Sequence, residues 1–192
     1  MKKKILLCAM ILLSLALAAF AGPFGLEMGM TLEEVAKACG GKRPEHIGDH
    51  RYLIEPVKKH PSFSTYIAWI SPAEGLNYIR ANSEKIYSNN TGDQVKNQFY
   101  RVENALSKSY GEPVLIDRVS KDSLYKKESF WMHTLGTGER ELCASWFPKN
   151  NDIIFIALWA LAENSYSSTA IISIVYEFQN HEKAQAELDD VL

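Results

Sequence analysis

The residue types that could bind a metal or transfer a proton gather in one short segment, which contains Glu45, His46, Asp49 and His50. On a helix, the four-residue spacing of the two histidines would place both imidazoles on one side, as zinc sites require. Pro44 and Gly48 instead predict a loop, where exposed histidines and carboxylates are ordinary. We therefore expect a solvated loop without a bound metal, and the sequence indicates no cofactor.

A hydrolase would need a nucleophile, a base and an orienting group held together. The sequence contains no Gly-x-Ser-x-Gly elbow, His-Glu-x-x-His pair, P-loop or dinucleotide-binding glycine motif. We therefore assign no catalytic residue. A secreted hydrolase or metal-dependent enzyme stays open as an alternative, and it requires carboxylates or a nucleophile in a pocket with His46, His50, His60 or His133.

Aromatic residues form the more informative candidate site, because they fall on predicted strands or strand ends. Such residues usually pack a core, but protein interfaces favour exposed Trp and Tyr anchors. An aromatic sheet face that binds a protein or peptide is our leading hypothesis, and the candidate residues are Tyr66, Trp69, Trp131, Trp146 and Trp159. A carrier of a small apolar ligand is a further alternative, which needs a closed cavity between helices and sheet.

The elements that would position these aromatics are two helices, each followed by strands. Thr31 and Glu34 form a capping-box pattern at the start of the first helix, and Gly40 ends it. Apolar residues spaced four, three and four apart predict a second helix over residues 94–110. A final short helix begins after Asn180. The remaining pattern predicts strands at 22–30, 51–57, 63–70, 76–81, 129–135, 141–147, 153–162 and 169–178.

This order predicts an α+β fold in which helices pack on one face of an antiparallel sheet. It divides the chain into two tandem helix-then-strands repeats, residues 22–90 and 91–192, within one compact unit. The alternative is one continuous sheet with helices across it.

Residues 1–21 have the three parts of a secretory signal peptide. Three lysines at positions 2–4 precede an apolar run, and Ala19-Phe20-Ala21 supplies the small residues that signal peptidase accepts. The alternative is an uncleaved membrane anchor, but the apolar region, residues 5–21, has 17 residues, which is the short limit for a membrane span. We expect cleavage before Gly22, a periplasmic or secreted location, and no stable membrane span afterwards.

Removal of this segment changes the charge and the cysteine count. It contains three lysines and no acid, so the remaining chain has 18 basic and 23 acidic residues and a formal charge of −5. An acidic domain is a poor binder of nucleic acid or of anionic membrane surfaces. The remaining cysteines, Cys39 and Cys143, are either a disulfide of an oxidising compartment or two buried thiols.

The start of the first helix resembles a known motif. Residues 29–35 read GMTLEEV and Gly40 closes the helix, which is similar to the Gly-Met-Thr-x-x-x-Val…Gly motif of the SmpA/OmlA (BamE) family of outer-membrane assembly lipoproteins. It also resembles the opening of both halves of the secreted β-lactamase inhibitory protein family. The second helix ends in YGEP at residues 110–113, similar to the Gly-x-Pro ending of such repeats.

These families are exported, non-enzymatic α+β modules that act by protein contact. The chain lacks the lipobox cysteine of the lipoproteins, so the resemblance does not imply membrane tethering or a role in outer-membrane assembly. We therefore expect an exported bacterial protein that binds a protein or another envelope component without catalysis.

Overall fold

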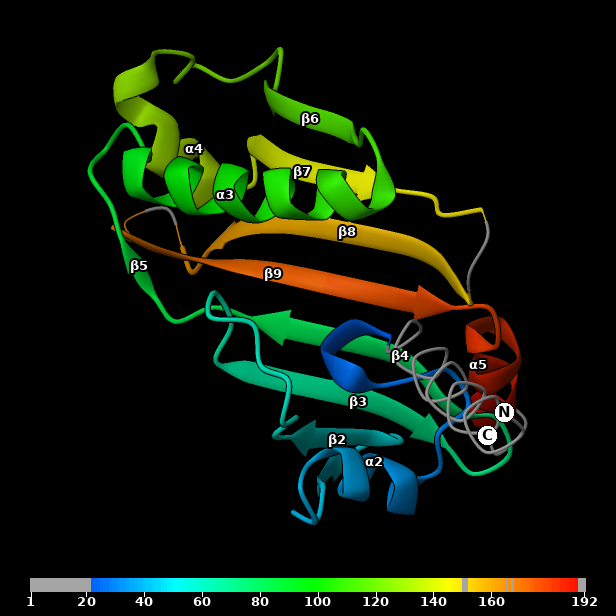
Figure 1. Cartoon of the computed structure of the whole chain (residues 1–192). Helices are drawn as coiled ribbons and strands as arrows, with labels where there is room; N and C mark the ends of the chain where they lie inside the picture. Colours follow the sequence, from blue (N-terminus) through cyan, green and yellow to red (C-terminus); the bar gives the residue numbers. More distant parts are fainter. Residues whose placement is uncertain (1–21, 150–151, 165, 167, 190–192) are drawn as a thin grey trace, which may run out of the picture.

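The computed structural model describes residues 22–149, 152–164, 166 and 168–189, and the predicted signal segment, residues 1–21, lies outside them. The described chain forms one sheet of nine antiparallel strands in the spatial order β1-β2-β3-β4-β9-β8-β7-β6, with β5 paired to β9 (Figure 1). The strands are β1 (Glu45–Gly48), β2 (Arg51–Ile54), β3 (Thr65–Ser71), β4 (Gly75–Asn82), β5 (Ile86–Tyr87), β6 (Val114–Val119), β7 (Arg140–Trp146), β8 (Ile153–Ala162) and β9 (Thr169–Phe178).

Each half of the sheet is a run of antiparallel strands that follows a helix. The helix α2 (Leu32–Ala38) precedes β1 to β4, and α3 (Asp93–Tyr110) precedes β6 to β9. The strand β4 of the first half pairs with β9 of the second half. In this pairing, Tyr78 lies opposite Glu177 and Asn82 lies opposite Ser173. This pairing joins both halves into one sheet. The predicted α+β class, with helices packed against an antiparallel sheet, is confirmed.

Local sequence signals explain where α2 begins and which side chains α3 buries. The Thr31 hydroxyl accepts a hydrogen bond from the Glu34 amide, and the Glu34 carboxylate accepts one from the Thr31 amide, so the capping box is complete. The apolar stripe of α3 is buried as the spacing predicts; its members are Val95, Phe99, Val102 and Leu106. No helix in the described ranges is long and apolar enough to cross a membrane.

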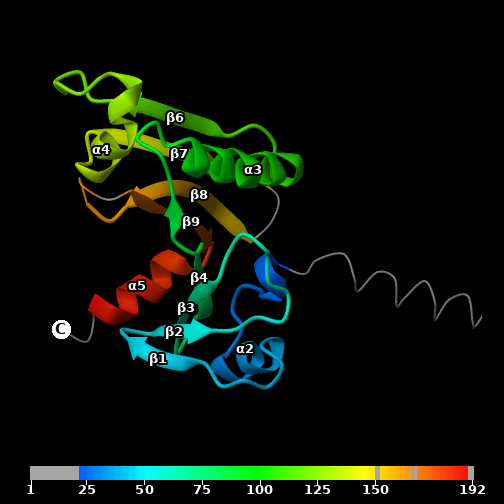
Figure 2. The same ribbon diagram turned by 90° about the vertical axis from the view of Figure 1, so that its left-hand side faces the viewer.

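The two faces of the sheet differ in what covers them. Alternate side chains of a strand point to opposite faces, and the strand registers place Ile79, Ile156 and Tyr176 on the same face as Tyr66. This face carries the main hydrophobic core, to which α2 and α3 contribute. Figure 2 shows α2 and α3 on that side of the sheet and α5 (His181–Asp189) on the other. The predicted one-sided packing therefore holds for α2 and α3, with α5 as the exception.

Three local predictions were wrong. Residues 129–135 form the 3₁₀ turn η2 (Glu128–Phe130) and the helix α4 (Trp131–Gly136) instead of a strand. Residues 22–30 contain the 3₁₀ turn η1 (Pro23–Gly25) instead of a lead-in strand, because Phe24 adopts a φ of 61°. That backbone places the Phe24 ring 4.9 Å from the ring of Tyr66 in the core. The segment with Glu45 and His46, expected to be a loop, forms β1.

Candidate functional site

Three of the five predicted binding aromatics belong to the core. Tyr66, Trp131 and Trp146 are 1%, 0% and 2% exposed, so they cannot contact a partner at the surface, and the binding prediction is corrected for these three. Trp146 and Trp131 make their contacts inside the protein. The indole N–H of Trp146 donates to the Gly111 carbonyl at 2.8 Å, and the Trp131 ring packs under Lys96, whose ammonium lies 4.9 Å from its centroid.

The other two, Trp69 and Trp159, are half-buried and lie on the second face of the sheet. Trp69 lies opposite Tyr78, Tyr78 opposite Glu177, and Glu177 opposite Phe155, so these side chains share one face. We call this surface the open face, because α2 and α3 lie on the opposite side (Figure 2). Its large side chains are Ile67, Trp69, Tyr78, Arg80, Phe155, Trp159 and Leu161.

One end of the open face is a packed group of three side chains. The rings of Trp69 and Tyr78 meet edge to face with centroids 4.8 Å apart. The Arg80 guanidinium lies 5.8 Å from the centroid of the Trp69 ring. Burial raises the pKa of Tyr78, and a hydrogen bond with Arg80 opposes that rise. The phenol therefore stays protonated at neutral pH and is held by both neighbours.

The other end of the open face is also aromatic. Trp159 lies opposite Cys143 on β7, and the rings of Phe155 and Phe147 have centroids 5.4 Å apart. Phe147 is 62% exposed, so it extends the apolar surface beyond the edge of the strand. Both ends of the face therefore present aromatic side chains to solvent.

Small side chains separate these two aromatic ends. Val175 lies opposite Arg80 and Ala157 lies opposite Val175, while Ser173 lies opposite Trp159. These three residues are almost fully buried, although α2 and α3 pack on the other face. The surface between the two aromatic ends is therefore formed by neighbouring side chains and not by these three small residues.

The helix α5 borders the open face at Tyr78. The Asn180 amide donates to the carbonyls of Glu74 and Leu76 at 2.7 and 3.2 Å, which anchors the start of the helix on β4. The His181 ring lies 5.0 Å from the Tyr78 ring, and burial lowers the pKa of His181 while Glu177 opposes that change. The helix therefore supports one side of the aromatic group.

The disulfide between Cys39 and Cys143 is not formed, since both residues are free and buried. Cys39 follows α2, on the helix-covered side of the first half of the sheet. Cys143 lies on β7 in register with Trp159, on the open face of the second half. The structure therefore contains two buried thiols in place of the disulfide. Burial raises the pKa of both thiols.

The histidines lie on separate elements. His46 is on β1 with its ring 5.2 Å from that of Tyr52, and His50 occupies the β1–β2 turn with a φ of 55°. His60 lies in the loop before β3, and burial lowers its pKa. In the described ranges, no group of three or more His, Cys, Asp or Glu side chains could hold a metal ion.

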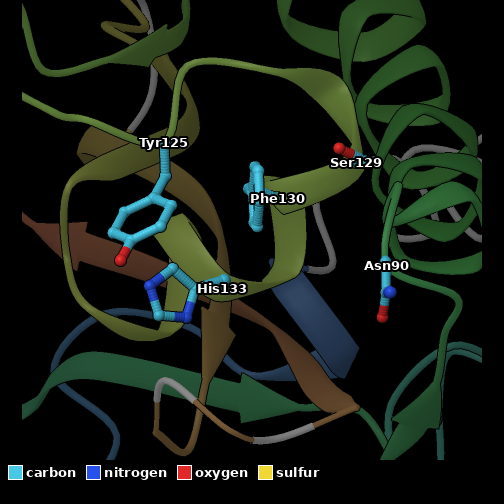
Figure 3. Close-up of a pocket in the computed structure, with 5 residues that line it drawn as sticks. All are labelled: Asn90, Tyr125, Ser129, Phe130 and His133. Carbon is cyan, nitrogen blue, oxygen red and sulfur yellow. The ribbon is translucent and has the colours of Figure 1, made fainter.

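His133 lines a small pocket of about 170 Å³ beside α4, together with Tyr125 and Phe130. The Tyr125 and His133 rings have centroids 4.7 Å apart. Ser129 and Asn90 complete the lining, but Figure 3 shows the Phe130 ring between Ser129 and His133. A serine–histidine nucleophile pair is therefore not assembled there, and no carboxylate lines the pocket.

Two larger cavities lie elsewhere, and both are open to solvent. One of about 270 Å³ lies between the start of α2 and the β3–β4 turn, and one of about 430 Å³ lies between Phe24, Lys58 and Tyr176. Neither is the closed cavity between helices and sheet that a carrier of an apolar ligand would use.

Sequence reasoning did not single out Tyr78, Arg80 and Phe155 as site residues. Tyr78 and Arg80 alternate with apolar residues on β4, and this period of two was the only sequence signal that both belong to one face of the strand. The period could not show which of the two alternating sets of side chains would face the helices.

No protein-family model matches the chain, and no curated protein and no solved structure matches it. Its function therefore has to be argued from the open face itself.

Proposed function

We propose that the chain is a non-catalytic binding module of the bacterial cell envelope, and that its open face binds another protein. The observation that carries the proposal is the presence of half-buried Trp69, Tyr78 and Trp159 on a face that α2 and α3 do not cover. Sheets usually bury an aromatic face against a second layer. An aromatic face that stays partly exposed is typical of protein interfaces, in which Trp and Tyr supply most of the binding energy.

Export is the second part of the proposal, and it rests on the sequence. Residues 1–21 have the pattern of a cleaved signal peptide, and the GMTLEEV motif resembles exported families that act by protein contact. The chain would then function in the periplasm or outside the cell. Mass spectrometry of protein purified from the periplasmic fraction tests this part, with Gly22 as the expected first residue. A product that keeps Met1 in the cytoplasm would contradict it.

Site-specific photo-crosslinking in the producing cell tests the binding surface. A photoreactive phenylalanine analogue replaces Trp159 in one strain and Trp69 in another. The matched control carries it at Lys108, which is exposed on α3 on the opposite side of the sheet. Half-buried aromatic positions accept the analogue with little loss of packing, and thermal melting of each purified variant verifies folding.

We expect one adduct of defined mass from both open-face positions and none from Lys108. Mass spectrometry of the adduct identifies the protein and the peptide that contacts the face. Equal labelling from all three positions would indicate random collision and reject the proposal. Labelling from Lys108 alone would place the binding surface on the helical side.

A further inference from the structure

Arg80 is an exposed cation within an aromatic and apolar surface. Its guanidinium lies over the Trp69 ring, and its side chain hydrogen-bonds to that of Tyr78. Its neighbours across the two adjacent strands are Ile67 and Val175, both apolar. The guanidinium is therefore oriented by two aromatic side chains and exposed to solvent.

Other arginines of the sheet have carboxylate partners, whereas Arg80 has none among the described residues. Arg51 pairs with Asp49 at 2.8 Å and Arg118 pairs with Glu141 at 3.2 Å. Glu177 is the acid nearest in register, opposite Tyr78, and it makes no ion pair with Arg80. A guanidinium has planar donors that match a carboxylate in two parallel hydrogen bonds.

Resting on the proposed function of the open face, we propose that Arg80 determines which protein segment binds there. The partner is a protein segment that presents an Asp or Glu carboxylate to Arg80, flanked by apolar side chains that contact the Trp69 and Trp159 ends of the face. Charge complementarity is the reason for choosing an acidic partner. Among the described residues, Arg80 is the only cation of this face without a carboxylate partner, and apolar groups surround it.

The probe is a pair of matched peptide arrays, tested with the purified chain that begins at Gly22. Each array contains pentapeptides whose outer positions are Leu, Val, Phe or Tyr. The central residue is Asp in one array and Asn in the other, so the arrays differ only in the charge of one group. Four proteins are compared: the wild-type chain, Arg80→Gln, Arg80→Lys and the control Arg118→Gln.

We expect the wild-type chain and the Arg118→Gln control to bind the best Asp peptides about tenfold more tightly than their Asn counterparts. Arg80→Gln should remove that preference while it keeps binding of the Asn peptides. Arg80→Lys should keep only part of the preference, because an ammonium cannot make the two parallel hydrogen bonds. An unchanged preference in Arg80→Gln, or an array without any binding, would overturn the assignment.

Two further outcomes separate this inference from the proposed function. If Trp159→Ala weakens peptide binding but Arg80→Gln changes nothing, the open face binds a partner and the role of Arg80 is wrong. If the chain forms a dimer in light scattering that both Arg80→Gln and Glu177→Gln dissociate, a second copy occupies the face and the peptide partner is rejected. The crosslinking experiment decides the proposed function independently of both.

Discussion

Truncation of one core tryptophan and one open-face tryptophan gives the sharpest test of the two-faced sheet. Trp146 is 2% exposed and donates a hydrogen bond to the Gly111 carbonyl, whereas Trp159 is half-buried on the open face. Both are strand residues and lie on the neighbouring strands β7 and β8. The same substitution, Trp→Ala, therefore compares the two faces with the chemistry held constant.

The magnitudes follow from burial. Loss of a fully buried tryptophan costs about 3–5 kcal/mol in the free energy of unfolding, because it removes transfer energy and leaves a cavity. The Gly111 carbonyl also loses its donor, which adds about 1 kcal/mol. Trp159→Ala should cost roughly 1–2 kcal/mol, since only part of its surface leaves water on folding. At about 2–4 °C per kcal/mol, Trp146→Ala lowers Tm by about 8–24 °C and Trp159→Ala by about 2–8 °C.

Urea unfolding followed by circular dichroism measures both free energies, and this readout does not depend on tryptophan fluorescence. Binding of the crosslinked partner is then measured for each variant that folds. We expect Trp159→Ala to weaken binding at a small cost in stability. If Trp159→Ala destabilises the chain as much as Trp146→Ala does, Trp159 is a core residue and the open face is not a surface.

Three other expectations concern the interior of the protein. Gly92→Ala should destabilise the chain by about 2–4 kcal/mol in urea unfolding, because φ is 74° and an added Cβ would lie 2.0 Å from the Trp131 ring. The matched control Gly138→Ala, with the same φ of 74° but no atom within 4 Å, should cost only about 1 kcal/mol. Equal losses would contradict the packing reason. The two buried cysteines should react with a thiol reagent only after unfolding, and a mass deficit of about two hydrogens would instead show a disulfide. Burial lowers the pKa of His181 in the folded chain, so below about pH 6.5 the unfolded chain binds a proton at this residue more readily than the folded chain does. The free energy of unfolding should therefore fall as the pH drops below about 6.5. His181→Gln should reduce the slope of this pH dependence, and an unchanged slope in urea titrations would refute the role of His181.

The helices α2, α3 and α5 were the most predictable elements, because their signals are local. The capping box of Thr31 and Glu34 and the apolar stripe of α3 each lie within one helical segment. Consecutive strands were nearly as clear, since β8 and β9 are long runs of β-branched and aromatic residues with the predicted bounds 153–162 and 169–178.

The missed elements depend on long-range partners. No strand was predicted at β6, whose residues 114–119 include Asp117 and Arg118, and this segment is a strand because it pairs with residues 140–145 of β7. Residues 131–136 include the strand-favouring Trp131 and Thr134, yet they form α4, whose Trp131 ring packs against Gly92 at the start of α3. No local pattern includes that contact.

The candidate site shows the same division. Sequence reasoning selected aromatic residues as a class, but it could not distinguish Trp146 from Trp159, since both lie on strands with similar neighbours. Burial separates them only after the register Trp146↔Ile156 and Cys143↔Trp159 assigns each to a face.

By itself, the sequence determined α2, α3, α5, most strands, the α+β class and the charge of the chain, because propensity, capping and apolar spacing are properties of neighbouring residues. The tertiary structure alone decided which face of the sheet is covered. The pairing of β4 with β9 and the docking of α2 and α3 bury one alternating set of side chains and leave the other at the surface. A shift of one residue in strand register would exchange the two sets, so exposure of Trp69, Arg80 and Trp159 is a consequence of long-range pairing.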